Sequence, residues 1–237
     1  MGEDAGGGAI LGGVPPPGHK LLRFDRRLGS RYVAGADEAG RGSLAGPLVV
    51  AGVLLDYACL RDHRVRPLAE LNDSKQVPRA DRERLFRAVM RCAERVSVQV
   101  IPPAVIDSEG LHRSNLAGLR AALHALSPPA EVCLVDGFRL GPTAPEHQAV
   151  VDGDEKSAAI AAASIVAKVT RDRYMRRADA LYPAFGFISH VGYITPGHSA
   201  IVRAQGPSEI HRRSFQALCY LSDEERAAVL AEREAAA

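Results

Sequence analysis

Short apolar segments rich in β-branched residues alternate along the chain with longer segments whose apolar residues recur at helical spacing. Amphipathic helices are predicted at about residues 78–95 and through the leucines between 116 and 126. A further strand, an acidic turn and a long alanine-rich helix that begins near Ser157 follow within residues 147–183. Strands are predicted at residues 32–36, 48–55, 96–101 and 131–137. This alternation predicts an α/β domain, and 237 residues suffice for one sizeable core.

The two ends of the chain differ in composition from the rest. Residues 1–30 are rich in glycine and proline, which predicts a disordered leader because such a segment buries little apolar surface. Residues 222–237 carry five acidic and two basic side chains, and Ser222 and Glu225 have capping-box spacing, so an acidic helix or frayed tail is expected. The catalytic-size domain is therefore predicted at residues 31–221.

Charge and cysteine content restrict the cellular setting. The net charge is +2, with −3 in the tail and +5 elsewhere, which is compatible with a polyanionic partner but does not by itself indicate one. The four cysteines are far apart and show no CxxC spacing, which disfavours a zinc site and favours a reduced compartment. No basic segment precedes an apolar run at the start, and eighteen consecutive apolar residues occur nowhere. We expect a cytoplasmic protein with no membrane contact.

Acidic residues stand where predicted strands end. Asp37 and Glu38 follow the first strand, and Asp136 follows the strand near residue 135. A third segment offers three acids whose spacing does not choose among them: Asp152, Asp154 and Glu155. Adjacent strand ends would bring one acid of each segment close together. The alternative is that each is an ordinary turn residue, since Asp-Gly at 136–137 and at 152–153 is a common turn dipeptide.

A cluster of carboxylates needs neutralisation because its members repel one another. Oxygen ligands without a histidine or thiolate cluster favour Mg²⁺ or Mn²⁺, whose open coordination positions accept water and substrate phosphate. Two such ions suit the hydrolysis of a phosphodiester. The sequence therefore indicates a metal-dependent phosphodiesterase.

The segment "DEAGRGSLAGP" at 37–47 resembles the signature opening of ribonuclease HII, the type 2 ribonuclease H family. Further segments follow in the family's order: "LNDSK" at 71–75, "LVDG" at 134–137, "GD" at 153–154, "AAASIVAKVTRD" at 161–172, "YPAFGFISHVGY" at 182–193 and "HRRSF" at 211–215. The resemblance covers about residues 31–217. It implies a ribonuclease H-like fold, in which a mixed central sheet is flanked by helices and a helical C-terminal part completes the nucleic-acid groove.

The resemblance also assigns roles to residues that the pattern alone left open. It implies that the fourth carboxylate is Asp154. It further implies that the backbone of Gly40, Arg41 and Gly42 contacts the 2′-hydroxyl of a ribonucleotide, where glycine lets backbone approach the sugar. Arg41 is in addition a candidate phosphate contact.

Other positions match the family's nucleic-acid contacts. Lys75 resembles a residue near the nucleic-acid backbone, and Tyr193 matches the tyrosine that packs on the sugar after the ribonucleotide. Asn115 and Lys168 are weaker candidates for backbone contacts. Val191 departs from the pattern, because many relatives carry lysine there. His211 is expected to support structure, and Arg212 and Arg213 to face either the duplex or solvent, outside the site.

The activity implied by the resemblance is metal-dependent endoribonuclease cleavage of the RNA strand in RNA/DNA hybrids. It includes incision 5′ of a single ribonucleotide in duplex DNA, leaving 3′-hydroxyl and 5′-phosphate ends, as in ribonucleotide excision repair. Two Mg²⁺ or Mn²⁺ ions would be held by Asp37, Glu38, Asp136 and Asp154, in a protein expected to be monomeric. A non-catalytic nucleic-acid-binding domain is the alternative. A nucleotide-binding phosphotransferase is disfavoured because the chain has no GxxxxGK[ST] segment.

Overall fold

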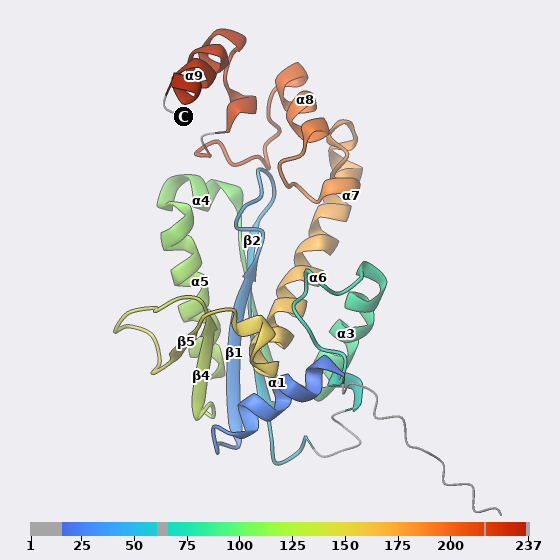
Figure 1. The fold of residues 1–237 in the computed structure, drawn as a ribbon, viewed down its shortest axis with the longest axis vertical. Coiled ribbons are helices and arrows are strands. Elements are labelled where there is room, and N and C mark those ends of the chain that lie inside the picture. The colour runs from blue at the N-terminus through green and yellow to red at the C-terminus, as the bar shows by residue number, and fades with distance from the viewer. Residues whose placement is uncertain (1–15, 61–65, 216, 236–237) are drawn as a thin grey trace, which may run out of the picture.

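A five-stranded mixed sheet forms the centre of the molecule, and its strands lie in the order β3-β2-β1-β4-β5. The computed structural model describes residues 16–60, 66–215 and 217–235 (Figure 1). The strands are β1 (Tyr32–Ala39), β2 (Leu48–Asp56), β3 (Arg95–Ile101), β4 (Val132–Asp136) and β5 (Gln148–Val150). Strands β1, β2 and β3 pair antiparallel, whereas β4 pairs parallel with β1 and β5 parallel with β4. The carboxyl ends of β1 and β4 therefore meet at one edge of the sheet.

Helices cover both faces of the sheet. The long helix α6 (Ala158–Leu181) crosses one face and α5 (Leu111–Leu126) covers the other (Figure 1). Alternate residues of β1 enter two separate cores, so that Val33 packs on the α6 side and Ala34 on the α5 side. The small residues that open α6 let it approach the sheet closely, since a Cβ on Gly35 would lie 2.2 Å from the carbonyl carbon of Ala159. The predicted N-cap is also present, because the Ser157 hydroxyl accepts the N–H of Ile160.

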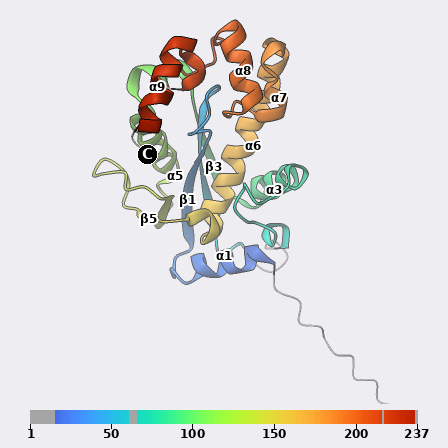
Figure 2. The same cartoon turned by 45° about the horizontal axis from the view of Figure 1, so that its top comes forward.

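The remaining helical elements lie around this layer. Before α6 in the chain they are α1 (Pro17–Arg26), η1 (Arg66–Leu68), α3 (Arg79–Cys92), α4 (Pro103–Glu109) and η2 (Gly153–Glu155). The C-terminal part contains η3 (Pro183–Phe185), α7 (Phe187–His190), α8 (Pro196–Gln205), η4 (Leu218–Tyr220) and α9 (Asp223–Ala235). A third core, which includes Leu44 and Phe187, joins this C-terminal part to the loop after β1 (Figure 2). The predicted fold class, a mixed sheet flanked by helices with a helical C-terminal part, is confirmed.

Two predicted boundaries need correction. Within the predicted disordered leader, residues 17–26 form α1, and Leu21 and Leu22 are buried in the core beside α6. Residues 1–15 of that leader lie outside the described residues. The first two acids stand inside β1, which runs to Ala39 and not to residue 36.

The acidic tail forms the helix that its sequence predicted. The backbone N–H of Ser222 donates to Glu225, and the N–H of Glu225 donates to the Ser222 hydroxyl, which is the reciprocal capping box. Among the described residues, no helix combines the length and the apolar composition needed to cross a membrane.

Candidate active site

Asp37 and Glu38 occupy successive positions of β1 and therefore point to opposite faces of the sheet. Asp37 is directed towards α6, where it lies beside Ser164, and only 6% of its surface is exposed. Glu38 is directed towards α5, beside the fully buried Asn115. The acidic pair thus straddles the end of the strand, and one carboxylate approaches the site from each face.

The other two predicted acids come from neighbouring segments. Asp136 ends β4, whose parallel register places Val135 beside Ala36, so Asp136 lies next to Asp37. The N–H of Gly153 donates to Asp136 Oδ1 at 2.7 Å and so fixes η2 against β4. Within η2, Asp154 is buried at 7% exposure. The three chain segments therefore meet as the sequence predicted.

Asp154 is buried, whereas its two acidic neighbours in the sequence are exposed. Asp152 is exposed and adopts a left-handed backbone conformation with φ of 50°. Glu155 is also exposed, and its carboxylate accepts a hydrogen bond from the Gln76 side chain. Of the three acids that the pattern could not separate, Asp154 alone is enclosed next to Asp136.

The pKa values show how closely the carboxyl groups are packed. Burial raises the pKa of Asp37 well above its usual range, and the charges of Glu38 and Asp136 raise it further. Burial also raises the pKa of Asp136. The pKa of Asp154 rises to about 6, mainly through burial and then through the charge of Asp136. Each group thus resists ionisation, because burial and the charges of neighbouring acids disfavour its charged form.

The loop at 71–75 adds a fifth acid and a cation that face the same place. Asp73 is buried, accepts the N–H of Lys75 at 2.9 Å and lies close enough to Asp154 for its charge to raise the pKa of Asp154. Burial lowers the pKa of Lys75, but the charges of Asp73, Asp154 and Asp37 outweigh it and leave that pKa raised. Lys75 therefore lies beside the carboxylates, whereas the contribution of Asp73 was missed although it stands within the "LNDSK" segment.

The donor set fits a hard divalent cation. Its members are carboxylates without histidine or cysteine, and Glu38 Oε2 is buried without a hydrogen-bond partner. As the side chains stand, no three acidic, histidine or cysteine residues of the described ranges are placed to hold a metal ion together. The groups thus have the right chemistry and the right neighbourhood, and coordination requires side-chain movement towards a common centre.

The two glycines around Arg41 differ in why they are needed. Gly40 has φ of 92°, and a Cβ there would lie 1.9 Å from Arg171 Nε, so the fold itself requires glycine. Gly42 has no atom within 4 Å of the place where its Cβ would be, so the fold leaves that space open. Arg41 lies over the ring of Phe138 at 4.8 Å and within 3.7 Å of Glu38.

Two buried arginines donate hydrogen bonds to backbone carbonyls of the loop that follows β1. Arg171 donates to the carbonyls of Pro47, Ala45 and Val191 at 2.9–3.0 Å. Arg212 donates to the carbonyls of Gly46 and Arg41, each at 3.0 Å. The expectation that Arg212 faces the duplex or solvent is wrong, because the side chain is fully buried. Both arginines stand inside segments that were recognised in the sequence, but nothing in those segments indicated burial against backbone carbonyls.

Tyr193 lies beside the same loop. It forms an isolated backbone bridge with Ser43, and the neighbouring Gly192 carbonyl accepts the N–H of Leu44 at 2.9 Å. The ring is 37% exposed, with Lys168 Nζ 5.4 Å from its centroid. Tyr193 thus presents a partly open ring next to the loop that follows the acidic pair, and Lys168 supports it.

A network of neutral histidines secures the turn that carries Tyr193. His198 Nδ1 contacts the Tyr193 carbonyl at 2.9 Å, and His198 Nε2 contacts His211 Nε2 at 3.0 Å. The N–H of Ser208 donates to His211 Nδ1, so His211 bears its proton on Nε2 and donates to His198. Burial lowers the pKa of His211 to about 4. The expected supporting role of His211 agrees with this network.

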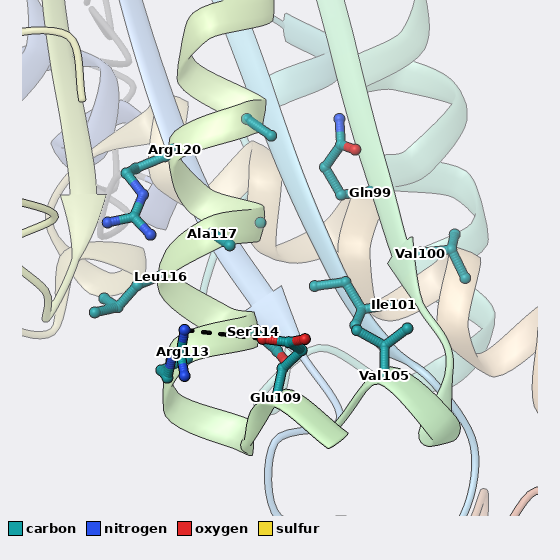
Figure 3. A pocket seen from close by; sticks show the side chains of 12 residues that line it. Gln99, Val100, Ile101, Val105, Glu109, Arg113, Ser114, Leu116, Ala117 and Arg120 are labelled. Atoms are coloured by element: carbon teal, nitrogen blue, oxygen red, sulfur yellow. Dashed lines mark ion pairs between the residues drawn. The ribbon is translucent and has the colours of Figure 1, made fainter. Parts of the chain in front are cut away.

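A large cavity lies away from these acids. It measures about 600 Å³ and lies between α5 and β3, bounded by Gln99, Ile101 and Ala117 (Figure 3). Two of its charged residues, Glu109 and Arg113, pair with each other at 3.9 Å. None of the four acids lines it, so we assign the chemistry to the edge of the sheet.

A mixed sheet with acids gathered at the ends of β1 and β4 and beside α6 defines an enzyme of the ribonuclease H-like class. The family model for ribonuclease HII matches residues 34–218. A ribonuclease HII of Salinispora tropica is 47% identical over 83% of this chain and 71% of its own length. One of Rhizobium meliloti is 44% identical over 86% of this chain and 91% of its own length. The chain belongs to the ribonuclease HII family and is a ribonuclease H hydrolase.

Solved structures agree with the fold. The crystal structure of ribonuclease H2 from Pyrococcus horikoshii OT3 superposes with a TM-score of 0.66 at 27% sequence identity. The match covers 85% of this chain and 98% of that one. The similarity therefore extends across the sheet and most of its helices.

Proposed function

We propose that this ribonuclease H is a metal-dependent endonuclease that cuts the RNA strand of RNA/DNA hybrids and incises 5′ of a single ribonucleotide embedded in duplex DNA. The observation that carries the proposal is the convergence of Asp37, Glu38, Asp136 and Asp154, whose pKa values are all raised by burial. Such a cluster is costly to a fold unless a cation compensates for it.

The four carboxylates are the proposed ligands of two Mg²⁺ or Mn²⁺ ions. When bound, such ions lower the pKa of an attacking water and stabilise the leaving 3′-oxygen, which yields 3′-hydroxyl and 5′-phosphate ends. Asp37 and Glu38 approach from opposite faces of β1. Asp136 comes from the neighbouring strand β4, and Asp154 comes from η2, which is hydrogen-bonded to Asp136. Lys75 supplies a fixed positive charge at the border of the cluster, where a scissile phosphate would lie.

The loop from Gly40 to Gly42 is the proposed reader of the ribose 2′-hydroxyl. The space beside Gly42 is free of protein atoms, which fits a sugar approaching the backbone there. Tyr193, bridged to Ser43, is placed to pack on the following sugar. A deoxyribose at that position has no hydroxyl to obstruct the ring. We infer that the enzyme recognises the junction between a ribonucleotide and a deoxyribonucleotide by shape.

Substitution of single acids tests the assignment. Asp37→Asn and Asp136→Asn remove a ligand charge at constant size, and each is expected to lower the rate of hybrid cleavage by about 10³-fold or more while the fold is kept. Asp154→Asn is expected to be severely impaired, and the exposed neighbour Asp152→Asn is the matched control with near-parent activity. Cleavage of a labelled hybrid on a denaturing gel measures both. Near-parent rates for Asp37→Asn, or greater loss in Asp152→Asn than in Asp154→Asn, contradict the proposal.

The monomeric state and the cytoplasmic location stay predictions. The same cleavage assays test the effect of Val191. Its carbonyl accepts a hydrogen bond from Arg171 Nη1, and its backbone is left-handed with φ of 44°. Its side chain offers no charge to the duplex.

A further inference from the structure

The helix α1 precedes the residues matched by the family model, yet it is packed into the core beside the start of α6. It lies across one end of the molecule, beneath the first turn of α6 (Figures 1 and 2). Leu21 and Leu22 anchor it among the alanines of that turn. The catalytic proposal gives α1 no role, although it contacts the start of α6 and the segment that leads to the 71–75 loop.

A carboxylate of α1 caps α6 from outside the helix. Asp25 is fully buried, and its Oδ2 accepts the N–H of Ala159 at 2.9 Å and the hydroxyl of Tyr57 at 2.7 Å. Ser157 and Ala158 lie close to this carboxylate and lower its pKa, against the larger effect of burial. The first turn of α6 has unpaired N–H groups and a positive dipole end, so an anion placed there holds the turn in position.

Two further hydrogen bonds connect the start of α6 to the candidate site. The N–H of Ser157 donates to the Gly153 carbonyl at 2.8 Å, and the N–H of Gly153 donates to Asp136 Oδ1 at 2.7 Å. Asp154 stands between Gly153 and Ser157. Gly153 is closely packed, because a Cβ there would lie 2.5 Å from Ile160 of α6. The position of Asp154 is therefore set by the first turn of α6, which Asp25 holds.

The other end of α1 contacts the segment that leads to the 71–75 loop. The N–H of Gly18 donates to the Ala69 carbonyl at 2.9 Å. A Cβ on Gly18 would lie 2.1 Å from the Leu68 carbonyl oxygen, so the two backbones touch. One helix thus contacts both the support of Asp154 and the approach to Asp73 and Lys75.

The carboxylate is a poor choice for packing alone. Burial raises the pKa of Asp25 to about 6, and Asp25 Oδ1 has no protein hydrogen-bond partner. An apolar side chain would anchor α1 without burying a charge. What the carboxylate adds is directional: its Oδ2 accepts the backbone N–H of Ala159, in the helix turn that follows Asp154.

We infer that Asp25 is a positioning residue of the active site, which acts through the first turn of α6 to hold Asp154 where a metal ion is bound. The inference rests on the proposed function because it assumes a metal ion at Asp154. The hydrogen bond that links Asp25 to the 153–160 segment is independent of that function. Support of a ligand from outside the coordination sphere typically changes metal affinity by about tenfold or more. Asp25 touches neither metal nor substrate.

Four variants separate positioning from general stability. Asp25→Ala removes the cap, and Asp25→Asn keeps one acceptor oxygen without the charge. Tyr57→Phe removes the other hydrogen bond to Asp25 but leaves the Ala159 contact intact. Leu123→Ala lowers stability from the core on the opposite face of the sheet. The last two serve as matched controls.

The first readout is amide hydrogen exchange of residues 153–160 in metal-free protein, and the second is Mn²⁺ binding by titration calorimetry. Asp25→Ala is expected to exchange faster in that segment and to bind Mn²⁺ about tenfold more weakly. The turnover number is expected to fall while KM for the duplex stays unchanged. Asp25→Asn is expected to lie between Asp25→Ala and the parent, and Tyr57→Phe and Leu123→Ala are expected to match the parent in Mn²⁺ affinity.

The outcomes distinguish the two proposals. Unchanged exchange and unchanged Mn²⁺ affinity in a folded Asp25→Asn or Asp25→Ala protein overturn the positioning role, as does equal weakening in Leu123→Ala. If Asp25→Ala does not fold, Asp25→Asn decides alone. A parent protein that binds no Mn²⁺ and cleaves no hybrid overturns the proposed function instead. In that case, faster exchange in the variants still shows that Asp25 holds the segment.

Discussion

Asp154→Asn is predicted to stabilise the metal-free protein at alkaline pH while it removes activity. The pKa of Asp154 is raised to about 6 from its ordinary value of 3.8, mainly by burial and then by the charges of Asp136 and Asp73. The folded state therefore disfavours the ionised form. Asparagine has the same size and carries no charge, so it removes the repulsion from Asp136 and Asp73.

The size of the effect follows from the two pKa values. Because the pKa is higher in the folded state, the penalty is absent below about pH 3.8, grows as the pH rises, and is complete above about pH 6. At about 1.4 kcal/mol per pH unit, ionised Asp154 costs the folded protein ~3 kcal/mol. For a chain of this length, that corresponds to an increase in Tm of about 6–12 °C for Asp154→Asn at pH 8.

Thermal unfolding followed by circular dichroism, in chelator at pH 8 and at pH 4, measures the difference. Asp154→Asn is expected to unfold at higher temperature than the parent at pH 8 and at nearly the same temperature at pH 4. The exposed Asp152→Asn is the control, and its change is expected within about 0.5 kcal/mol because asparagine tolerates left-handed backbone. Equal or lower stability of Asp154→Asn at pH 8 would refute the view that this acid is buried at a cost.

Three further predictions concern the loop, the ring and the histidines. Gly42→Val is expected to fold with parent stability but to lose cleavage. Gly40→Ala is expected to lose stability, because Gly40, unlike Gly42, has positive φ and lies against Arg171. Unfolding curves and a gel assay separate the two, and parent activity in Gly42→Val contradicts the proposal that a sugar occupies the space beside Gly42. Tyr193→Ala is expected to keep the fold, since its ring is partly exposed, and to lose most incision at a single ribonucleotide, because the scissile phosphate is no longer held in place; incision at the parent rate would remove the junction-reading idea. The pKa of His211 is lowered to about 4, so the unfolded chain binds a proton first as the pH falls below 6.5. The free energy of unfolding is therefore expected to drop by up to ~3 kcal/mol between pH 6.5 and pH 4. Denaturant unfolding should show a smaller pH dependence in His211→Gln, and an unchanged pH dependence would exclude this residue as the cause.

The strands and their acids were predictable from sequence because the signals are local. A run of valine and leucine indicates a buried strand wherever it lies, and Asp136 directly follows such a run. The choice of Asp154 over Asp152 and Glu155 needed the family resemblance. What separates them physically is a tertiary contact, the hydrogen bond from Gly153 to Asp136, which no periodicity in the segment reveals.

Two features could not be foreseen for the same reason. The glycine and proline content of residues 1–30 outweighed the few apolar residues of α1, and Leu21 and Leu22 become buried only because the alanines of α6 are there to receive them. Arg171 and Arg212 are buried against backbone carbonyls, and neither forms an ion pair with any residue the structure describes. Arginine in a sequence normally indicates an exposed charge.

The central claim is that the gathered carboxylates hold metal ions that cut beside a ribonucleotide. The most direct measurement is incision of a labelled DNA duplex containing one ribonucleotide, run beside an all-DNA duplex with Mg²⁺, with Mn²⁺ and with chelator. We expect one cut, 5′ of the ribonucleotide, with either metal, no cut in chelator and no cut in the all-DNA duplex. Undiminished cleavage in chelator, or equal cleavage of the all-DNA duplex, would contradict it.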